Sequence, residues 1–174
     1  WVDYTFTAKI LNPRTGLPYC LNGEDTTIRV YINPTPKIAV SVEDTLCNNE
    51  TAGFTVSTLT GSTTGTWVYD ISAIASDAQV SGYRSASDTT ALTFSDVLTN
   101  PTNTLQWVDY TFTAKILNPR TGLPYCLNGE DTTIRVYINP TPKIAVSVED
   151  TLCNNETAGF TVSTLTSSTT GTWV

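Results

Sequence analysis

The side chains of this 174-residue chain that could do chemistry are its four cysteines and its paired carboxylates, because the sequence contains no histidine. Without an imidazole base, hydrolysis of the Ser-His or Cys-His kind is excluded. The cysteines form no C-x-x-C pair and no histidine completes a zinc set, so sulfur ligation of a metal is not expected. Disulfide bonding remains, and it indicates export to an oxidising, extracellular environment.

Two pairs of adjacent carboxylates, Glu43-Asp44 and Glu130-Asp131, stand at turns beside predicted strands. A glycosidase needs two carboxyl groups that face each other across a cleft, whereas neighbours at a turn point into solvent. We therefore expect no catalytic residues, no enzymatic activity and no resident cofactor. Calcium is the one candidate ion, because these four carboxylates could supply oxygen ligands if they met near one end of a domain. The sequence has no D-x-D-x-D-G loop, which argues against a dedicated calcium site.

An internal repeat dominates the organisation of the chain. Residues 1–68 and 107–174 are the same except that Gly61 is replaced by Ser167, so the period is 106 residues. Solenoid repeats of about 20–50 residues share one core, whereas a period of this length matches a small independent domain. The sequence therefore predicts separate domains in tandem.

The domain boundaries are predicted from a proline motif. Asn33-Pro34-Thr35-Pro36 recurs at 139–142, and two prolines so close together make a short, stiff, extended linker. The chain then divides into 1–34, the C-terminal strands of one repeat; 35–140, a complete repeat; and 141–174, the N-terminal strands of the next.

Alternation of apolar and polar residues predicts the elements of the complete repeat. Positions 108, 110, 112, 114 and 116 are apolar and their neighbours are mostly polar, the pattern of a strand with one buried face. Such strands are expected at 37–42, 51–60, 65–71, 79–83, 90–94, 106–117 and 132–139. Short strands of this kind, with turn residues between them, predict antiparallel sheets packed face to face in an immunoglobulin-like β-sandwich.

Charge and hydropathy limit the partners. The net charge of −7 argues against a nucleic acid, which attracts a basic surface. No apolar run approaches the roughly 20 residues of a membrane helix, so we expect no membrane insertion in this segment. An acidic surface is typical of soluble, mutually repelling repeats.

Two disulfide pairings are open on sequence grounds. Cys47 and Cys126 lie within one predicted repeat, 79 residues apart, and a bond between them is worth about 4.5 kcal/mol in the chain-entropy model. Cys20 and Cys47 lie 27 residues apart across the linker, and that bond is worth about 3.6 kcal/mol. We favour Cys47–Cys126, because a bond inside the domain lets each repeat fold alone.

The repeat resembles the PKD-like, immunoglobulin-fold domains that occur in long arrays in secreted surface proteins of the Bacteroidota. The resemblance covers essentially the whole chain. It is carried by GTW at 65–67, VSG at 80–82, LTNPT at 98–102, YTFT at 110–113, CLNG at 126–129, VYINPTP at 136–142 and LCN at 152–154. The W-x-F-G-D-G-type motif of PKD domains proper is absent, so the chain looks like the divergent branch. The resemblance implies giant adhesins and gliding-associated filaments, often exported by the type IX system, with no catalytic residues.

The resemblance suggests a function for two surface features. Asp44-Thr45-Leu46 and Asp150-Thr151-Leu152 resemble the D-[ST]-aliphatic O-glycosylation signal of that phylum, so Thr45 and Thr151 are candidate glycosylation sites. Trp107 lies on the polar side of its predicted strand and is the candidate contact surface for a neighbouring repeat, another chain or a sugar.

The expected function is mechanical: a stiff, disulfide-stabilised stalk on the cell surface for adhesion or gliding motility, whose partners are the neighbouring repeats of the same chain. The alternatives are an array that binds surface glycans through Trp107 and a filament whose subunits complete each other's folds.

Overall fold

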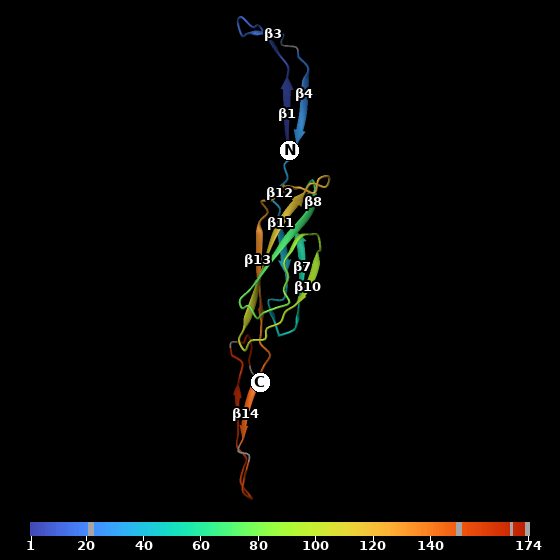
Figure 1. The fold of residues 1–174 in the computed structure, drawn as a ribbon. Helices are drawn as coiled ribbons and strands as arrows, with labels where there is room; N and C mark the ends of the chain where they lie inside the picture. Colours follow the sequence, from blue (N-terminus) through green and yellow to red (C-terminus); the bar gives the residue numbers. More distant parts are fainter. Residues whose placement is uncertain (21–22, 149–150, 168, 173–174) are drawn as a thin grey trace. The chain divides into compact units, whose positions relative to one another are not determined.

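The computed structural model describes residues 1–20, 23–148, 151–167 and 169–172, and every regular element within them is a β-strand (Figure 1). The all-β class predicted from the alternating sequence is confirmed. Contacts divide the chain into two compact units, Trp1–Pro34 and Thr35–Val174. The residues described here include no helix long and apolar enough to cross a membrane.

Residues 35–140, within the second unit, form two β-sheets. The first sheet has the antiparallel order β10-β7-β5, and the second has the order β6-β13-β11-β8-β9, with β12 paired to the end of β11. The strands are β5 (Ile38–Ser41), β6 (Thr45–Leu46), β7 (Thr51–Thr58), β8 (Thr66–Ala75), β9 (Ala86–Thr89), β10 (Thr93–Val97), β11 (Gln106–Leu117), β12 (Pro124–Cys126) and β13 (Asp131–Ile138). Only β6 and β13 pair in parallel. Because β5 belongs to one sheet and β6 to the other, the first segment of the repeat joins both sheets.

The core lies between the two sheets and has the side chains that the alternation predicted. On β11, Val108, Tyr110, Phe112, Ala114 and Ile116 are fully buried, and the residues between them are partly exposed. Aromatic rings fill the centre. The ring centroids of Phe54 and Phe94 lie 4.4 Å apart in a stacked pair, and those of Phe54 and Tyr110 lie 4.7 Å apart in a tilted pair. These contacts join β7 and β10 to β11, so the packing is between sheets and not only along them.

The segment between β8 and β10 differs from the sequence prediction. The strand predicted at 79–83 is a single bridge, Ser81 to Thr99, because Gly82 adopts a φ of 90° and passes the backbone of Val97 so closely that a Cβ would overlap it. The strand predicted at 90–94 begins only at Thr93. Strand β9 was not predicted, because Ala-Ser-Asp-Thr has no apolar alternation.

A polar network is buried at the edge of the core. The Tyr110 hydroxyl donates a hydrogen bond of 2.8 Å to Asp96 Oδ2, and Arg84 Nε lies 3.0 Å from Asp96 Oδ1. Asp96 itself is 5% exposed. Burial, together with the hydrogen bond to Asp96, raises the pKa of Tyr110 far above its ordinary value. The network therefore connects the edge strand β10 to the central strand β11 through a neutral tyrosine.

A second polar cluster attaches β9 to the sheet. Lys115 Nζ on β11 lies 2.7 Å from Asp70 Oδ1 and 2.6 Å from Asp88 Oδ1. Burial opposes the charge of Lys115, but the hydrogen bonds to Asp70 and Asp88 outweigh it and raise its pKa. Burial likewise opposes the charge of Asp70, yet hydrogen bonds from Lys115 and from the Asp88 amide lower its pKa.

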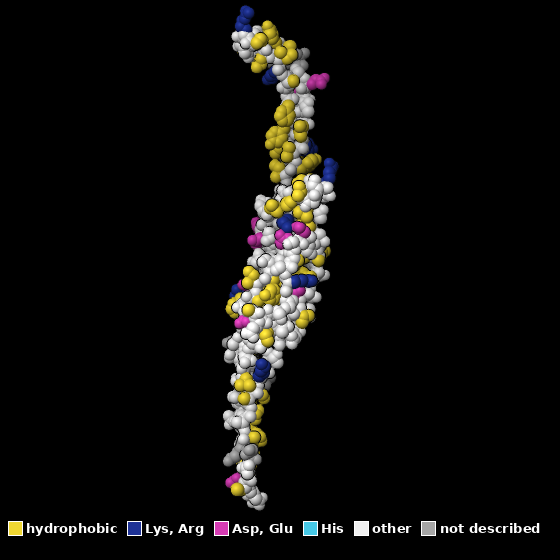
Figure 2. Space-filling model, viewed as in Figure 1, with side chains coloured by type: hydrophobic (Ala, Val, Ile, Leu, Met, Phe, Trp, Pro, Cys, Tyr) yellow, Lys and Arg dark blue, Asp and Glu magenta, His cyan; other side chains and the backbone are white. Residues whose placement is uncertain are grey.

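The partial repeats contain the same strand pairs without a sandwich. Residues 1–34 form β1 (Val2–Thr7), β2 (Ile10–Leu11), β3 (Pro18–Cys20) and β4 (Asp25–Val30), and residues 141–174 include β14 (Ile144–Val148) and β15 (Phe160–Thr164). Each residue has a counterpart 106 positions away, and β1–β4 has the register of β11–β13. Their burial differs: Phe6 is 58% exposed and Phe112 is 0% exposed. Figure 2 shows hydrophobic side chains gathered along the 1–34 hairpin. Strand pairing is therefore local, whereas burial requires the whole repeat.

The duplicated sequence offers a matched test of the core. We expect Phe112→Ala to destabilise repeat 35–140 by about 3–5 kcal/mol, because it opens a cavity between the sheets. Phe6→Ala removes the same side chain from an exposed counterpart and should change the free energy of unfolding by less than about 0.5 kcal/mol. Urea unfolding followed by tryptophan fluorescence measures both, and equal effects would contradict the assigned core.

We also expect Lys115→Met to flatten the acid dependence of stability. The folded pKa of Asp70 is lowered, so its contribution is present above the ordinary carboxyl pKa of about 4 and is lost as the pH falls through the folded value. Without Lys115 this shift shrinks. The difference should stay below about 1 kcal/mol, because Asp70 is partly exposed.

Urea unfolding at pH 5 and pH 2.5 measures that difference. Lys9→Met, the exposed counterpart of Lys115, is the control and should leave the pH dependence unchanged. An identical pH dependence in the wild type and Lys115→Met would show that the ion pairs add nothing.

Candidate functional site

The chain enters repeat 35–140 at one end and leaves it at the other. We call the end of entry the N-terminal pole and the end of exit the C-terminal pole. At the N-terminal pole, the Pro36 carbonyl accepts a hydrogen bond of 3.0 Å from the Glu130 amide, and Lys37 Nζ lies 2.6 Å from Glu130 Oε1. At the C-terminal pole, Ile138 pairs with Leu46, and the Asn139 amide donates to the Leu46 carbonyl at 2.8 Å. The two poles are separated by the length of β13, about 27 Å at 3.4 Å per residue.

The structure does not bring the four candidate calcium ligands together. Glu130 is paired with Lys37, and Asp131 accepts a 2.6 Å hydrogen bond from the Thr113 hydroxyl, both near the N-terminal pole. Glu43 and Asp44 precede β6, and the Asp44 carbonyl accepts from the Tyr137 amide at the other end of β13. Among the residues that the structure describes, no three His, Cys, Asp or Glu side chains are grouped to hold a metal.

The structure does not bring Cys47 and Cys126 of one repeat together either. Cys47 follows Leu46 at the C-terminal pole, level with Gln106 at the start of β11. Cys126 pairs with Ile116, ten residues further along the same strand, which is about 34 Å away. Bonded cysteines have Cα atoms within about 7 Å of each other. Cys20 lies on β3 beside Ile10 in the first unit, and Cys153 is exposed.

The remaining candidate residues lie at the surface. Thr45 is half-buried on β6, where it pairs with Tyr137, and Thr151 is exposed. Asp150, the acidic residue of the second glycosylation motif, is outside the described residues. Glycosylation of either threonine stays a prediction.

Trp107 is half-buried and faces a charged neighbour. The Arg135 guanidinium lies 4.9 Å from the centroid of its ring and makes two hydrogen bonds to Asp109, of 2.7 and 2.8 Å. These hydrogen bonds hold the pKa of Asp109 below its ordinary value and raise that of Arg135. One side of the indole is therefore covered by a cation, which reduces the ring surface open to a sugar.

Three asparagines at the C-terminal pole bind the segment that begins the next repeat. Asn139 Nδ2 donates to Thr170 Oγ1 at 2.7 Å, and the Thr170 amide donates to Asn139 Oδ1 at 2.8 Å. Asn48 Nδ2 donates to Thr141 Oγ1 at 2.8 Å. The Asn103 side chain accepts from Lys143 Nζ at 3.0 Å, and its carbonyl accepts from an amide of the same segment. We call this set of contacts the junction.

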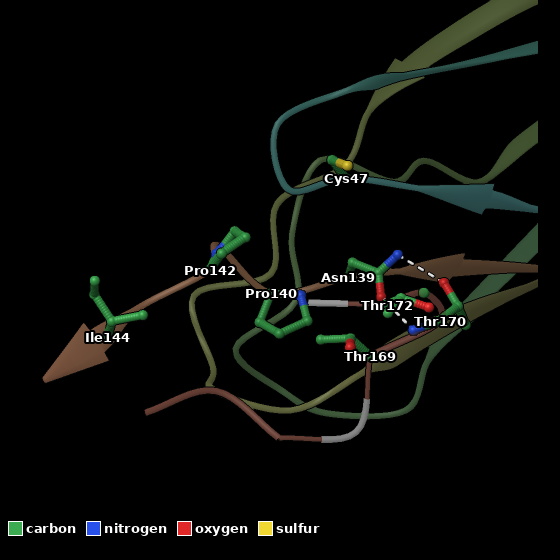
Figure 3. A pocket seen from close by; sticks show the side chains of 9 residues that line it. Cys47, Asn139, Pro140, Pro142, Ile144, Thr169, Thr170 and Thr172 are labelled. Atoms are coloured by element: carbon green, nitrogen blue, oxygen red, sulfur yellow. Dashed lines mark hydrogen bonds between the residues drawn. The ribbon is translucent and has the colours of Figure 1, made fainter. Parts of the chain in front are cut away.

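A pocket lies at the junction. It has a volume of about 510 Å³, and its wall includes Cys47, Asn139, Pro140, Pro142, Thr170 and Gly171 (Figure 3). The walls thus come from the C-terminal pole of one repeat and from the segment 141–174 of the next. The dashed lines in Figure 3 mark the two hydrogen bonds between Asn139 and Thr170. The arrangement brings a thiol and side-chain amides of one repeat next to the segment that begins the next.

The asparagines of the junction were not predicted from the sequence. The Asn-Pro-Thr-Pro motif was interpreted only as a stiff spacer. The available signal was an asparagine placed directly before the proline, since a side-chain amide can both donate to and accept from a neighbouring chain. Nothing in the spacing indicated that Thr170 would be its partner.

Comparisons with known proteins give no family: no protein-family model matches the chain, and no curated protein matches it. The resemblance to PKD-like repeats therefore remains a prediction that rests on its own residues.

We expect Asn139→Ala to loosen the junction while leaving repeat 35–140 folded. The substitution removes two hydrogen bonds, each worth about 0.5–1.5 kcal/mol, so the Thr170 amide should exchange its hydrogen at least several-fold faster. Thr170→Val removes only the hydroxyl acceptor and should give a smaller effect. Amide exchange followed by NMR measures both, and unchanged Thr170 protection in Asn139→Ala would contradict the junction.

Proposed function

We propose that this chain is a structural segment of a long extracellular surface adhesin or filament. In this proposal, immunoglobulin-like repeats of the PKD-like type form a stiff stalk for cell adhesion or gliding motility. The observation that carries the proposal is that the chain enters repeat 35–140 at one pole and leaves it at the other. An array of such domains becomes longer with each repeat. Domains whose N- and C-termini lay at the same end would instead radiate from a common point.

The strand order supports the immunoglobulin-like part of the proposal. The sheets β10-β7-β5 and β6-β13-β11-β8-β9 share the first segment of the repeat, which leaves one sheet as β5 and joins the other as β6. A seven-to-nine-strand sandwich of about 100 residues with two such sheets is the architecture described for immunoglobulin domains.

The parallel pair β6–β13 suits a domain under tension. Tension on a tandem chain pulls Pro36 and Asn139 in opposite directions along the strands. The hydrogen bonds from the Tyr137 amide to Asp44 and from the Asn139 amide to Leu46, both 2.8 Å, lie across that direction. They must therefore shear together instead of opening one at a time. Leu46, 3% exposed, anchors β6 in the core at the same place.

The junction supports stiffness between domains. Proline restricts the linker, and the asparagine hydrogen bonds at 139, 48 and 103 attach the next segment to the pole it leaves. A net charge of −7 keeps such chains apart in solution. The cation over Trp107 gives the glycan-binding alternative less support than the mechanical one.

Single-molecule pulling on the chain, attached at residues 1 and 174, tests the proposal. Repeat 35–140 should unfold in one step that lengthens the chain by about 350 Å, the extended length of some 106 residues less the folded length. The unfolding force should fall strongly in Leu46→Ala, which weakens the sheared pair.

Ile71→Ala is the matched control. Ile71 is as buried as Leu46 but lies on β8, away from the sheared strands, so it should lose similar thermodynamic stability and little mechanical strength. Equal losses of force in the two variants, or gradual yielding of the wild type at low force, would contradict a mechanical role.

A further inference from the structure

Two residues that line the junction pocket, Pro142 and Gly171, have counterparts in the complete repeat, Pro36 and Gly65, and the space beside these counterparts is occupied. At the N-terminal pole of repeat 35–140, β12 and the residues after it, which we call loop 124–130, lie between two fixed points. The Pro36 carbonyl binds the Glu130 amide at the end of the loop, at 3.0 Å. Gly65 lies against the start of the loop, since a Cβ placed on it would come within 3.3 Å of the Tyr125 ring. Cys126 is the residue after Tyr125 and is half-buried there.

The counterparts of those two fixed points both line the junction pocket. Pro142 corresponds to Pro36 and Gly171 to Gly65, and each contributes to the wall opposite the previous repeat. In a tandem array, the copy of loop 124–130 that belongs to the next repeat must therefore lie between Pro142 and Gly171. That position is the pocket itself.

Cys47 lines the same pocket from the other side. We propose that the counterpart of Cys126 in each following repeat enters this pocket and forms a disulfide with Cys47, so that consecutive repeats are covalently connected at every junction. This pairing uses one cysteine from each pole of each repeat. It leaves no cysteine over inside the array, in agreement with the even count of two per period.

A bond within one repeat fails on distance, and a bond from Cys47 to Cys153 fails on position. Cys47 and Cys126 of one repeat lie about 34 Å apart along β11, far beyond the roughly 7 Å limit. Cys153 is the counterpart of Cys47 and therefore belongs to the far pole of the next repeat, not to the junction.

The reaction is a two-electron oxidation. The Cys47 thiol and its partner each lose one proton, and the two sulfurs form one S–S bond as two electrons pass to a disulfide oxidant. That oxidant is reduced to two thiols by exchange through a mixed disulfide. Glutathione disulfide supplies this chemistry in the test below.

The bond would change how the array responds to tension. Tension would then follow a short covalent path. This path runs from residue 35 to Cys47, crosses the S–S bond, and leaves through the last strand of the next repeat. Most of two repeats would lie outside this path and could not be extended. The inference rests on the tandem arrangement of the proposed function, but its test measures cysteine pairing and not force, so the failure of one is distinguishable from the failure of the other.

Peptide mapping of a long native array cannot separate the two pairings, because identical repeats give identical linked peptides. The 174-residue chain can once Cys20 and Cys153 are replaced by serine, since Cys47 and Cys126 of one repeat are then its only thiols. After incubation at low protein concentration in a glutathione redox buffer, we expect its Cys47 and Cys126 to remain unlinked to each other. An intrachain Cys47–Cys126 peptide would overturn the proposal.

The positive test completes the next repeat. The chain is extended after Val174 with a copy of residues 69–140, and all cysteines except two are replaced by serine. One variant keeps Cys47 and the appended copy of Cys126; the matched control keeps Cys47 and Cys126. Both variants have two thiols and the same length, and they differ only in which cysteine is kept together with Cys47.

We expect the first variant to form at least tenfold more intramolecular disulfide than the control in the same buffer. Cooperative urea unfolding of both reduced variants establishes that they are folded before oxidation. Equal oxidation of the two variants, or no disulfide in the first, would overturn the inter-repeat bond.

Discussion

The parallel pairing of β6 with β13 is the constraint on which the rest of this structure depends. The first segment of the repeat runs parallel to β13, from Pro36 beside Glu130 to Leu46 beside Ile138, so the chain enters the repeat at one pole and leaves it at the other. The same constraint decides which hairpin completes the core. Residues 1–34 have the sequence of 107–140, yet residues 33–36 span at most about 11 Å, whereas the poles lie about 27 Å apart. The preceding hairpin therefore cannot fill the place of β11 and β13 in the same repeat.

The duplicated sequence separates local from non-local determinants of the fold. The hairpins β1–β4 and β11–β13 have the same register, because alternation and turn residues are properties of the segment. Phe6 and Phe112 differ in burial, because a buried face needs a second sheet. Polar clusters follow the same rule. Lys115 has Asp70 and Asp88 as partners on two other strands, and those strands occur only within the complete repeat.

Much of the fold was therefore predictable from the sequence, and most of the candidate site was not. The alternation of β11 gave its buried face residue by residue. Strand β9 was missed because its own residues show no apolar alternation, whereas it is held by pairing with β8 and by the Lys115–Asp88 ion pair. The preference for a Cys47–Cys126 bond rested on loop entropy, which depends on separation along the chain and carries no information about which pole each cysteine occupies. The junction asparagines escaped notice for the same reason, since their partner is a residue of the next repeat.

In the proposed stalk, the junction holds consecutive repeats in one fixed, end-to-end arrangement, and a distance between equivalent points of two repeats tests this most directly. Spin labels on Cys47 and Cys153 mark such points in the chain extended to a complete second repeat, with Cys20, Cys126 and the appended copy of Cys126 replaced by serine. Pulsed electron paramagnetic resonance should give one narrow distribution centred near 40 Å, about the length of one repeat along its strands. A broad distribution that reaches below about 25 Å would contradict a stiff junction and, with it, the stalk.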